Sequence, residues 1–184
     1  MMDAIEMIKG RRSVRTYRDE KVDRELLAKI VEVSRWSPSW GNLQIARYTF
    51  VDNAQMIEAI YSRGVKGFGY NMKTLKNTRS LLVLSYVQGK SGKLDGVNYA
   101  TEKGAEWEMF DAGIACQTFC LAAHAYGVGS CIFGVIDDGV ISEIVGLPEG
   151  ETVAAVITLG YEEGDTTVVT PRKEVEKLMR FAEL

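Results

Sequence analysis

The chain has 184 residues, of which 46% are hydrophobic and 26% are charged, the balance of a folded protein rather than a disordered one. Its net charge of −3 gives no overall reason to expect a nucleic-acid partner. The N-terminus lacks the apolar run of a secretory signal, and no segment reaches the roughly 20 apolar residues that span a bilayer. We therefore expect one domain over residues 1–184, with neither nucleic-acid nor membrane partners.

The first part of the chain predicts two helices, a polar loop and a strand. A short helix is expected within residues 3–10. A second helix begins after Asp23, which can cap it, and its apolar residues recur at helical spacing. This helix should stop before Ser37-Pro38, because the residue before proline resists helical geometry. The polar loop that follows leads to a strand at residues 48–51.

Helices and strands are interleaved along the rest of the chain, which indicates an α+β layered subunit. The longest helix, at 106–126, is apolar on more than one face, which is typical of a subunit core or a subunit interface. The strand at 152–159 is apolar enough for the middle of a sheet. A last helix near 175–182 has one apolar face. Further helices are expected at 54–61 and 140–145, and further strands at 81–86 and 131–133.

The first candidate site is the basic segment after the first helix, Arg11-Arg12-Ser13-Val14-Arg15. Arginine can direct two hydrogen bonds onto phosphate oxygens, and a serine hydroxyl can add another. A phosphate monoester therefore suits this density of donors and positive charge. A solvated basic turn or a nucleic-acid patch would have the same composition, so the segment alone leaves those interpretations open.

The second candidate is the polar loop at 37–44, Ser-Pro-Ser-Trp-Gly-Asn-Leu-Gln. Its small residues let a ligand approach the backbone, and Asn42 and Gln44 offer both donors and acceptors. Such groups suit the edge of a heteroaromatic ring that carries carbonyl and imide groups. Trp40 can stack on such a ring or fill the core, and a plain polar loop is the alternative.

Two further segments can face a ligand. The glycine-rich segment 127–134 follows a helix and enters a strand, the reverse of the order in a dinucleotide-binding loop, so a Rossmann site is excluded. It is a tight turn whose backbone can still face a ligand. Arg172 and Lys173 follow Pro171 after the last strand and lie around a phosphate or in solvent.

The chain has few groups for acid–base or nucleophilic catalysis. Its one histidine, His124, lies in the longest helix, where we expect a packing or interface role. Its three cysteines, Cys116, Cys120 and Cys131, leave one unpaired in any disulfide scheme, so reduced, buried thiols and a cytoplasmic protein are expected. An enzyme of this kind would take its chemistry from a cofactor.

Five segments, in their order along the chain, resemble the nitroreductase-like flavoproteins. They are R-R-S-x-R after the first helix, S-P-S-W-G-N-x-Q after the second, Asp111 before a small-residue helix, the G-x-G-x-C-x-x-G turn, and a late L-G-Y followed by P-R-K. The resemblance runs from the first helix to the last. It implies a three-layer α+β nitroreductase-like fold, with a central mixed, mostly antiparallel sheet flanked by helices. It also implies a homodimer with its sites at the subunit interface.

The resemblance assigns cofactor contacts but no catalytic side chain, since flavin N5 carries the chemistry. Around the FMN phosphate it places Arg11, Arg12, Ser13, Arg15, Arg172 and Lys173. The loop that reaches the flavin from the other subunit matches Pro38, Ser39, Trp40 and Asn42, with Gln44 beside them. At the ring it places Asn71, and Phe133 and Gly134 in a turn whose backbone amide points toward N5.

The implied function is an FMN-dependent oxidoreductase. NADH or NADPH reduces the flavin at N5, and the flavin then reduces a nitroaromatic, quinone or similar small-molecule acceptor by two electrons. The alternatives are a specialised flavin reductase or dehydrogenase, with selectivity in the segment 63–70, and a non-catalytic flavin-binding protein. Two features depart from the family pattern. Ile45-Ala46-Arg47 replaces a common proline and tryptophan, and only a helix, without a long tail to wrap a partner, is expected after Lys173.

Overall fold

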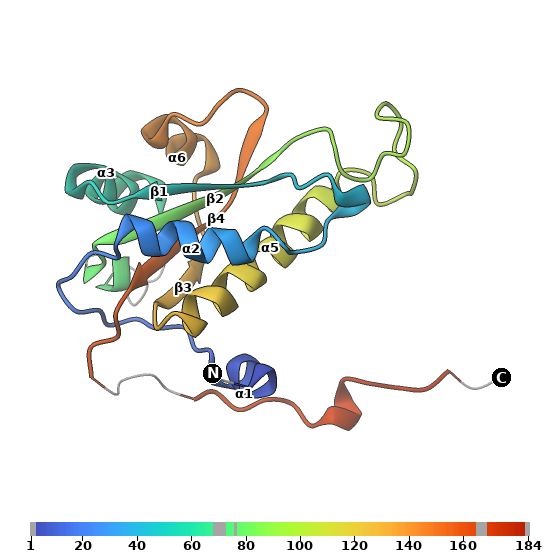
Figure 1. Ribbon diagram of the computed structural model, residues 1–184. Coiled ribbons are helices and arrows are strands. Elements are labelled where there is room, and N and C mark those ends of the chain that lie inside the picture. Colours follow the sequence, from blue (N-terminus) through green and yellow to red (C-terminus); the bar gives the residue numbers. More distant parts are fainter. Residues whose placement is uncertain (1–2, 68–72, 76, 165–168, 183–184) are drawn as a thin grey trace.

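A computed structural model describes residues 3–67, 73–75, 77–164 and 169–182 (Figure 1). Within these residues four antiparallel strands form one sheet in the order β1-β2-β4-β3. A parallel bridge joins Ser13 to Ser130, beside the first residues of β3. The described sheet is therefore antiparallel throughout, in agreement with the predicted mostly antiparallel sheet, and the one parallel pairing is an isolated bridge. The strands are β1 (Ala46–Val51), β2 (Ser80–Val87), β3 (Gly129–Phe133) and β4 (Glu151–Gly160).

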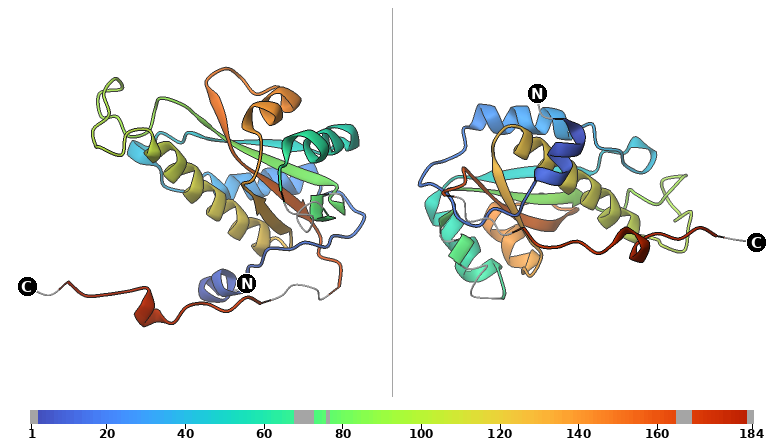
Figure 2. Two further views of the ribbon diagram at one scale, coloured as in Figure 1. Left: turned by 180° about the vertical axis from the view of Figure 1, so that it is seen from behind. Right: turned by 90° about the horizontal axis from the view of Figure 1, so that it is seen from below.

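Helices cover both faces of the sheet and give three layers (Figures 1 and 2). One face packs against α2 (Arg24–Ser34) and α5 (Glu106–Ala125), and the other packs against α3 (Ala54–Ala59) and α6 (Asp138–Val145). Because side chains alternate along a strand, β2 sends Leu82 and Leu84 to the α2–α5 face, and Leu81 and Val83 to the α3–α6 face. These four residues are fully buried, and together they form an unbroken apolar run, which is typical of a strand covered on both faces.

The predicted helix starts and stops are close to those observed. The helix α1 spans Ala4–Gly10, and α2 is capped by Asp23, whose carboxylate accepts a hydrogen bond from Glu25 N at 2.6 Å. The helix predicted at 54–61 ends at Ala59 and continues as a wider turn, η2 (Ile60–Gly64). The apolar strand predicted for the middle of the sheet is β4, which lies between β2 and β3.

The C-terminal segment corrects the prediction of a last helix. A single short turn, η3 (Val175–Lys177), forms there, and residues 169–182 otherwise run extended along the outside of the subunit (Figures 1 and 2). Leu178 and Phe181 are 68% and 81% exposed. A short helix is stable mainly when its apolar face is buried, and none of the described residues covers the apolar side chains of this segment. The helix expected after Lys173 is therefore wrong over most of its length, because an extended segment with one short turn takes its place.

The cysteines agree with the expectation of reduced, buried thiols. Cys116, Cys120 and Cys131 are free and buried on the inner side of α5 and in β3. A hydrogen bond with Cys120, followed by burial, raises the pKa of Cys116, so this thiol stays protonated at neutral pH. Structural packing, rather than disulfide formation, explains their place in the core.

The helix α5 buries one side and leaves a second, mostly apolar side partly exposed. Its 20 residues bury Ala112, Ala115 and Phe119 against the sheet and α2. Phe110, 59% exposed, begins a stripe on the opposite side that continues at helical spacing through Gly113, Ile114, Gln117 and Leu121. Within the part of the chain that the structure describes, none of the helices combines the length and apolarity that a bilayer crossing requires.

Candidate functional site

The arginine segment is held against the start of β3 through its backbone. Ser13 bridges Ser130, and Val14 N donates a hydrogen bond to Ser130 O at 3.0 Å. Gly129 permits this close approach, because a Cβ there would lie 2.8 Å from Val14 Cγ2. Gly127, with φ of 76°, makes the left-handed turn that ends α5. The two glycines of the predicted turn thus serve different purposes, one for the turn and one for the approach of the arginine segment.

The arginine segment and the C-terminal segment together form a cationic pocket of about 270 Å³. Its lining includes Lys9, Arg11, Arg12 and Arg172, and none of its described lining residues is a carboxylate. Arg12 donates hydrogen bonds to backbone carbonyls of its own turn. The structure thus brings Arg172 to the basic segment, as predicted, while the exposed Lys173 does not line this pocket. An anion is the ligand that this charge favours.

The predicted site residues Ser13 and Arg15 lie next to this pocket in sequence. Ser13 is half-buried, and Arg15 is exposed and donates a hydrogen bond to Ser13 O at 3.0 Å. Burial raises the pKa of Cys131, and the positive charge of the same Arg15 guanidinium partly opposes this shift. The positive field of the segment therefore extends from the pocket toward the first residues of β3.

The single histidine lies beneath this basic segment. His124 Nε2 is buried and, among the residues that the structure describes, has no hydrogen-bond partner. It lies close to Gly10, where a Cβ would stand 3.1 Å from Nε2. Burial, followed by Arg11 and Arg12, lowers the pKa of His124, so the imidazole is neutral at neutral pH. This is a packing position under a cationic surface, in line with the predicted role.

The polar loop has a strained backbone. It contains a short turn, η1 (Trp40–Asn42), and both Asn42 and Gln44 have left-handed φ angles, of 56° and 51°. Such a conformation costs a non-glycine residue roughly 1–2 kcal/mol, so other contacts must hold it. Gln44 N donates to Ser39 Oγ at 2.9 Å, and Arg47 donates to Gln44 O at 2.9 Å. Arg47, one of the departures from the family pattern, thus fastens the end of the loop.

A buried carboxylate at the start of α5 holds the same loop. Both oxygens of Asp111 lie 3.0 Å from Trp40 N, and Oδ2 also accepts a hydrogen bond from Ser91 Oγ at 2.6 Å. Trp40 Nε1 donates to Lys93 O at 2.9 Å, and its ring centroid lies 4.8 Å from that of Trp107. Asp111 belongs to one of the five segments of the family resemblance, but sequence reasoning gave it no functional role. Its position before the small-residue helix was the available signal.

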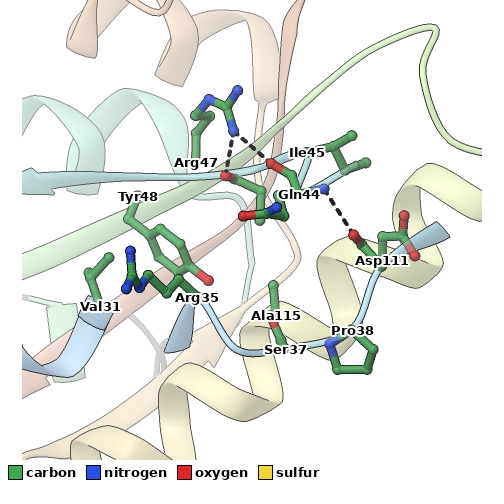
Figure 3. Close-up of a pocket in the computed structure, with 12 residues that line it drawn as sticks. Val31, Arg35, Ser37, Pro38, Gln44, Ile45, Arg47, Tyr48, Asp111 and Ala115 are labelled. Atoms are coloured by element: carbon green, nitrogen blue, oxygen red, sulfur yellow. Dashed lines mark hydrogen bonds between the residues drawn. The ribbon is translucent and has the colours of Figure 1, made fainter. Parts of the chain in front are cut away.

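A pocket of about 240 Å³ opens between this loop, α2, β1 and α5 (Figure 3). Its walls combine apolar groups such as Val31 and Ala115 with the polar groups of Ser37, Gln44 and Tyr48. Burial raises the pKa of Tyr48 to about 12, so the phenol keeps its proton. Apolar walls with a few polar groups suit a planar ring with a polar edge. The full lining is Val31, Arg35, Ser37, Pro38, Ser39, Gln44, Ile45, Ala46, Arg47, Tyr48, Asp111 and Ala115.

The predicted site residues form two clusters in one subunit. Asp111 contacts the polar loop, and His124 lies under the arginine segment, 124 − 111 = 13 residues further along α5. At the helical rise of 1.5 Å per residue, these positions are about 20 Å apart along the axis. Figure 1 shows α1 beside the C-terminal end of α5 and η1 near its N-terminal end. The loop pocket and the arginine pocket are accordingly separate.

The turn after β3 carries the remaining predicted contacts. Phe133 is buried in the core, and Gly134 is exposed directly after it, where its backbone is accessible to a ligand. Asn71 lies outside the described residues. Among the residues that are described, no group of three or more His, Cys, Asp or Glu side chains is placed to hold a metal ion.

The segment proposed for selectivity, 63–70, is described as far as residue 67. That part is tied to the chain after β3 by the ion pair between Lys66 and Asp137, at 2.6 Å, and by a bridge from Val65 to Ile136. The described part is therefore attached to the turn that follows Gly134, rather than to the polar loop.

Comparison with known proteins finds similarity to one family. The model of the nitroreductase family matches residues 8–161. A protein of Methanothermobacter thermautotrophicus, named as an NADH dehydrogenase/NAD(P)H nitroreductase, is 31% identical over 164 residues, covering 87% of this chain and 78% of that protein. An FMN-dependent nitroreductase of Clostridium difficile R20291 has a TM-score of 0.76 at 26% identity, covering 98% and 99% of the two chains. A nitroreductase of Desulfovibrio desulfuricans, solved in complex with FMN, has a TM-score of 0.76 at 19% identity, covering 100% and 99%.

Proposed function

The chain belongs to the nitroreductase family of oxidoreductases, and we propose that it binds FMN and uses it to carry two electrons from NADH or NADPH to a small acceptor. The observation that carries this proposal is the cationic pocket, in which Arg11, Arg12 and Arg172 meet and no described lining residue is a carboxylate. FMN is the cofactor named for the Clostridium relative and present in the Desulfovibrio complex.

The described residues fit both chemical parts of FMN. Its phosphate needs several cationic donors, and the arginine pocket with the adjacent Ser13 and Arg15 provides them. The pyrimidine edge of its ring presents carbonyl and imide groups, and the flavin-edge loop, residues 37–44, presents complementary amides and hydroxyls. The side chains proposed to contact the phosphate and the pyrimidine edge are therefore not buried away from the two pockets.

FMN, when bound, supplies the redox chemistry by taking two electrons at N5 and passing them to a nitroaromatic, quinone or similar acceptor. Arg11, Ser13 and Arg15 would hold the phosphate in place, and the backbone after Phe133 would contact the ring. The flavin-edge loop orients the ring and keeps water from it. No side chain of the chain is assigned a proton transfer, which agrees with the neutral, inward-packed His124.

We propose that the complete site forms in a homodimer. The stripe on α5 from Phe110 to Leu121 is mostly apolar, and in one subunit Phe110, Gly113 and Gln117 are exposed while Ile114 and Leu121 are half-buried. In a twofold pair the same patch meets itself, and two α5 helices crossing in opposite directions bring the N-terminal end of one to the C-terminal end of the other. The flavin-edge loop of one subunit then reaches the arginine pocket of its partner.

The C-terminal segment supports the same proposal. Its exposed apolar side chains include Val175, Leu178, Met179 and Phe181. A segment of this composition is stable in water when another surface covers it. Deletion of residues 169–184 should therefore convert a dimer into monomers and lower FMN retention, as measured by sedimentation equilibrium and flavin absorbance. A dimer of unchanged affinity after the deletion would contradict a role for this segment in assembly.

The experiment that tests the proposed function is an absorbance spectrum of the purified protein, before and after anaerobic NADH and then NADPH. We expect flavin bands that bleach with one or both reductants and return when a quinone or nitroaromatic is added. Bands that persist would favour a non-catalytic flavin-binding protein. A colourless protein that also refuses added FMN would overturn the cofactor assignment. A single FMN-binding domain over 1–184 and a cytoplasmic location stay predictions.

A further inference from the structure

We propose that Asp111 is the positioning residue for the flavin-edge loop and thereby sets how tightly the loop holds FMN. The inference rests on the proposed function, since it concerns a loop assigned to the flavin ring. Asp111 is 3% exposed, and both of its oxygens lie 3.0 Å from Trp40 N. Its carboxylate is therefore committed to the backbone of this loop rather than to solvent or to a cation.

The need for such a residue follows from the backbone of the loop. Directly after Trp40, residues 41, 42 and 44 have φ angles of 50°, 56° and 51°, a conformation that unconstrained residues rarely keep. The bond to Asp111 fixes the peptide that enters this strained turn. Because the acceptor is charged and buried, the hydrogen bond is stronger than one between neutral groups. Without it, Trp40 N loses its partner and the turn loses its first anchor.

Asp111 also joins the flavin-edge loop to a second loop. Oδ2 accepts from Ser91 Oγ at 2.6 Å, and Ser91 is fully buried. Trp40 Nε1 reaches Lys93 O in the same second loop, at 2.9 Å. In Figure 3 Asp111 enters the pocket from α5, on the side across from Tyr48. The Asp111 carboxylate thus fixes the positions of the two loops relative to each other and to the pocket wall on α5.

The chain offers a matched control one turn earlier on the same helix. Glu108 is also buried, at 4% exposed, and accepts a hydrogen bond from Lys90 N at 3.1 Å. It binds the second loop, and its hydrogen bond does not reach the flavin-edge loop. Loss of either carboxylate removes a buried charged acceptor, but only loss of Asp111 releases Trp40 N.

The test compares FMN affinity in Asp111→Ala, Asp111→Asn and Glu108→Ala by flavin fluorescence with apo-protein. Asp111→Ala should weaken FMN binding by about tenfold or more, the equivalent of 1.4 kcal/mol. Asp111→Asn should stay within about threefold of the parent, because its Oδ1 can accept from Trp40 N and its Nδ2 can donate to Ser91 Oγ. Glu108→Ala should also stay within about threefold.

Hydrogen exchange of the apo-protein gives a readout that does not depend on flavin. Asp111→Ala should speed exchange in residues 39–44, and Glu108→Ala should leave those amides unchanged. If Asp111→Ala does not fold, Asp111→Glu keeps the charge but displaces the carboxylate from Trp40 N, and it should show the same two effects.

Three results separate the possible failures. Parent-like FMN affinity in Asp111→Ala or in Asp111→Glu would overturn the positioning role. An equal loss of affinity in Glu108→Ala would reduce Asp111 to a general stability residue. If the parent protein binds no FMN at all, the proposed function fails, while the exchange measurement still decides whether Asp111 positions the loop.

Discussion

The two ends of α5 are built from opposite chemistry. At the N-terminal end two buried carboxylates, Glu108 and Asp111, accept hydrogen bonds from the backbone of two loops. At the C-terminal end Arg11 and Arg12 line a pocket above His124. Among the described residues, that pocket has no carboxylate in its lining and the buried His124 Nε2 has no hydrogen-bond partner. Glu108, in the first turn of α5, suits the helix dipole, which favours negative groups there, and positive groups are favoured near the last turn. At the N-terminal end the carboxylates accept hydrogen bonds from the chain itself and hold a loop in place. At the C-terminal end the arginines line a pocket whose positive charge favours an anion.

The largest expected effect is at the cationic end. Replacement of Arg11 and Arg15 together by alanine should raise the FMN dissociation constant by at least about 100-fold, because each charge-assisted hydrogen bond contributes on the order of 1.5–3 kcal/mol. Flavin fluorescence titration measures this change. Arg24→Ala, which removes an exposed partner of Asp52 away from the pocket, is the control and should bind normally. Normal flavin content in the double variant would remove the phosphate assignment.

A glycine variant tests whether the arginine segment must lie close to β3. Gly129→Ala adds a Cβ at 2.8 Å from Val14, which should cost about 1–3 kcal/mol of stability and weaken FMN binding about tenfold. Thermal unfolding and flavin titration measure the two effects. Gly127→Ala strains a left-handed turn but meets no atom within 4 Å, so it should lower stability and leave FMN affinity within about threefold. Equal flavin loss in both variants would contradict the close-approach argument.

At the carboxylate end, Trp40→Phe separates packing from flavin contact. The variant loses the hydrogen bond to Lys93 O and should cost about 0.5–1.5 kcal/mol in urea unfolding. Because Trp40 N keeps its bond to Asp111, FMN affinity should change by less than about threefold. A loss as large as that of the arginine variants would mean that the indole contacts the flavin directly.

The smallest expected effect is on pH dependence. Burial, Arg11 and Arg12 lower the pKa of His124, so the unfolded chain binds a proton at a higher pH than the folded chain does. This contribution to stability is complete above the unfolded pKa of about 6.5 and is lost as the pH falls below it. Apo-protein melting temperatures measured from about pH 7.5 to 5.5 should fall less steeply in His124→Gln. Identical profiles would remove this assignment. Bound FMN should also flatten the profile, since its phosphate offsets the two arginines.

The comparison of the two ends also shows what the sequence could predict. Local signals were sufficient for the helices before the C-terminal segment, the strands and the basic segment, because Asp23, the apolar spacing and the arginines act within a few residues of one another. The family, read from five short segments, agrees with the match over residues 8–161.

Long-range features were not predictable in the same way. The bond from Asp111 to Trp40 joins residues 71 positions apart, and nothing in either segment alone indicates the other. The C-terminal segment carried the spacing of an amphipathic helix but lacked a surface to bury it. The separation of the two clusters by the length of α5 became visible only in three dimensions.

We propose that one FMN site combines opposite ends of α5 from two subunits, and dimers mixed from two variants distinguish this arrangement from a site within one subunit. One parent carries Arg11→Ala and Arg15→Ala, and the other carries Asn42→Ala and Gln44→Ala in the flavin-edge loop. Each pure variant should bind FMN weakly. Equal mixing and random reassociation should restore about a quarter of the parent number of tight sites, because half of the dimers are hybrids with one intact site. No recovery in verified hybrids would place both halves of the site in the same subunit and contradict the account.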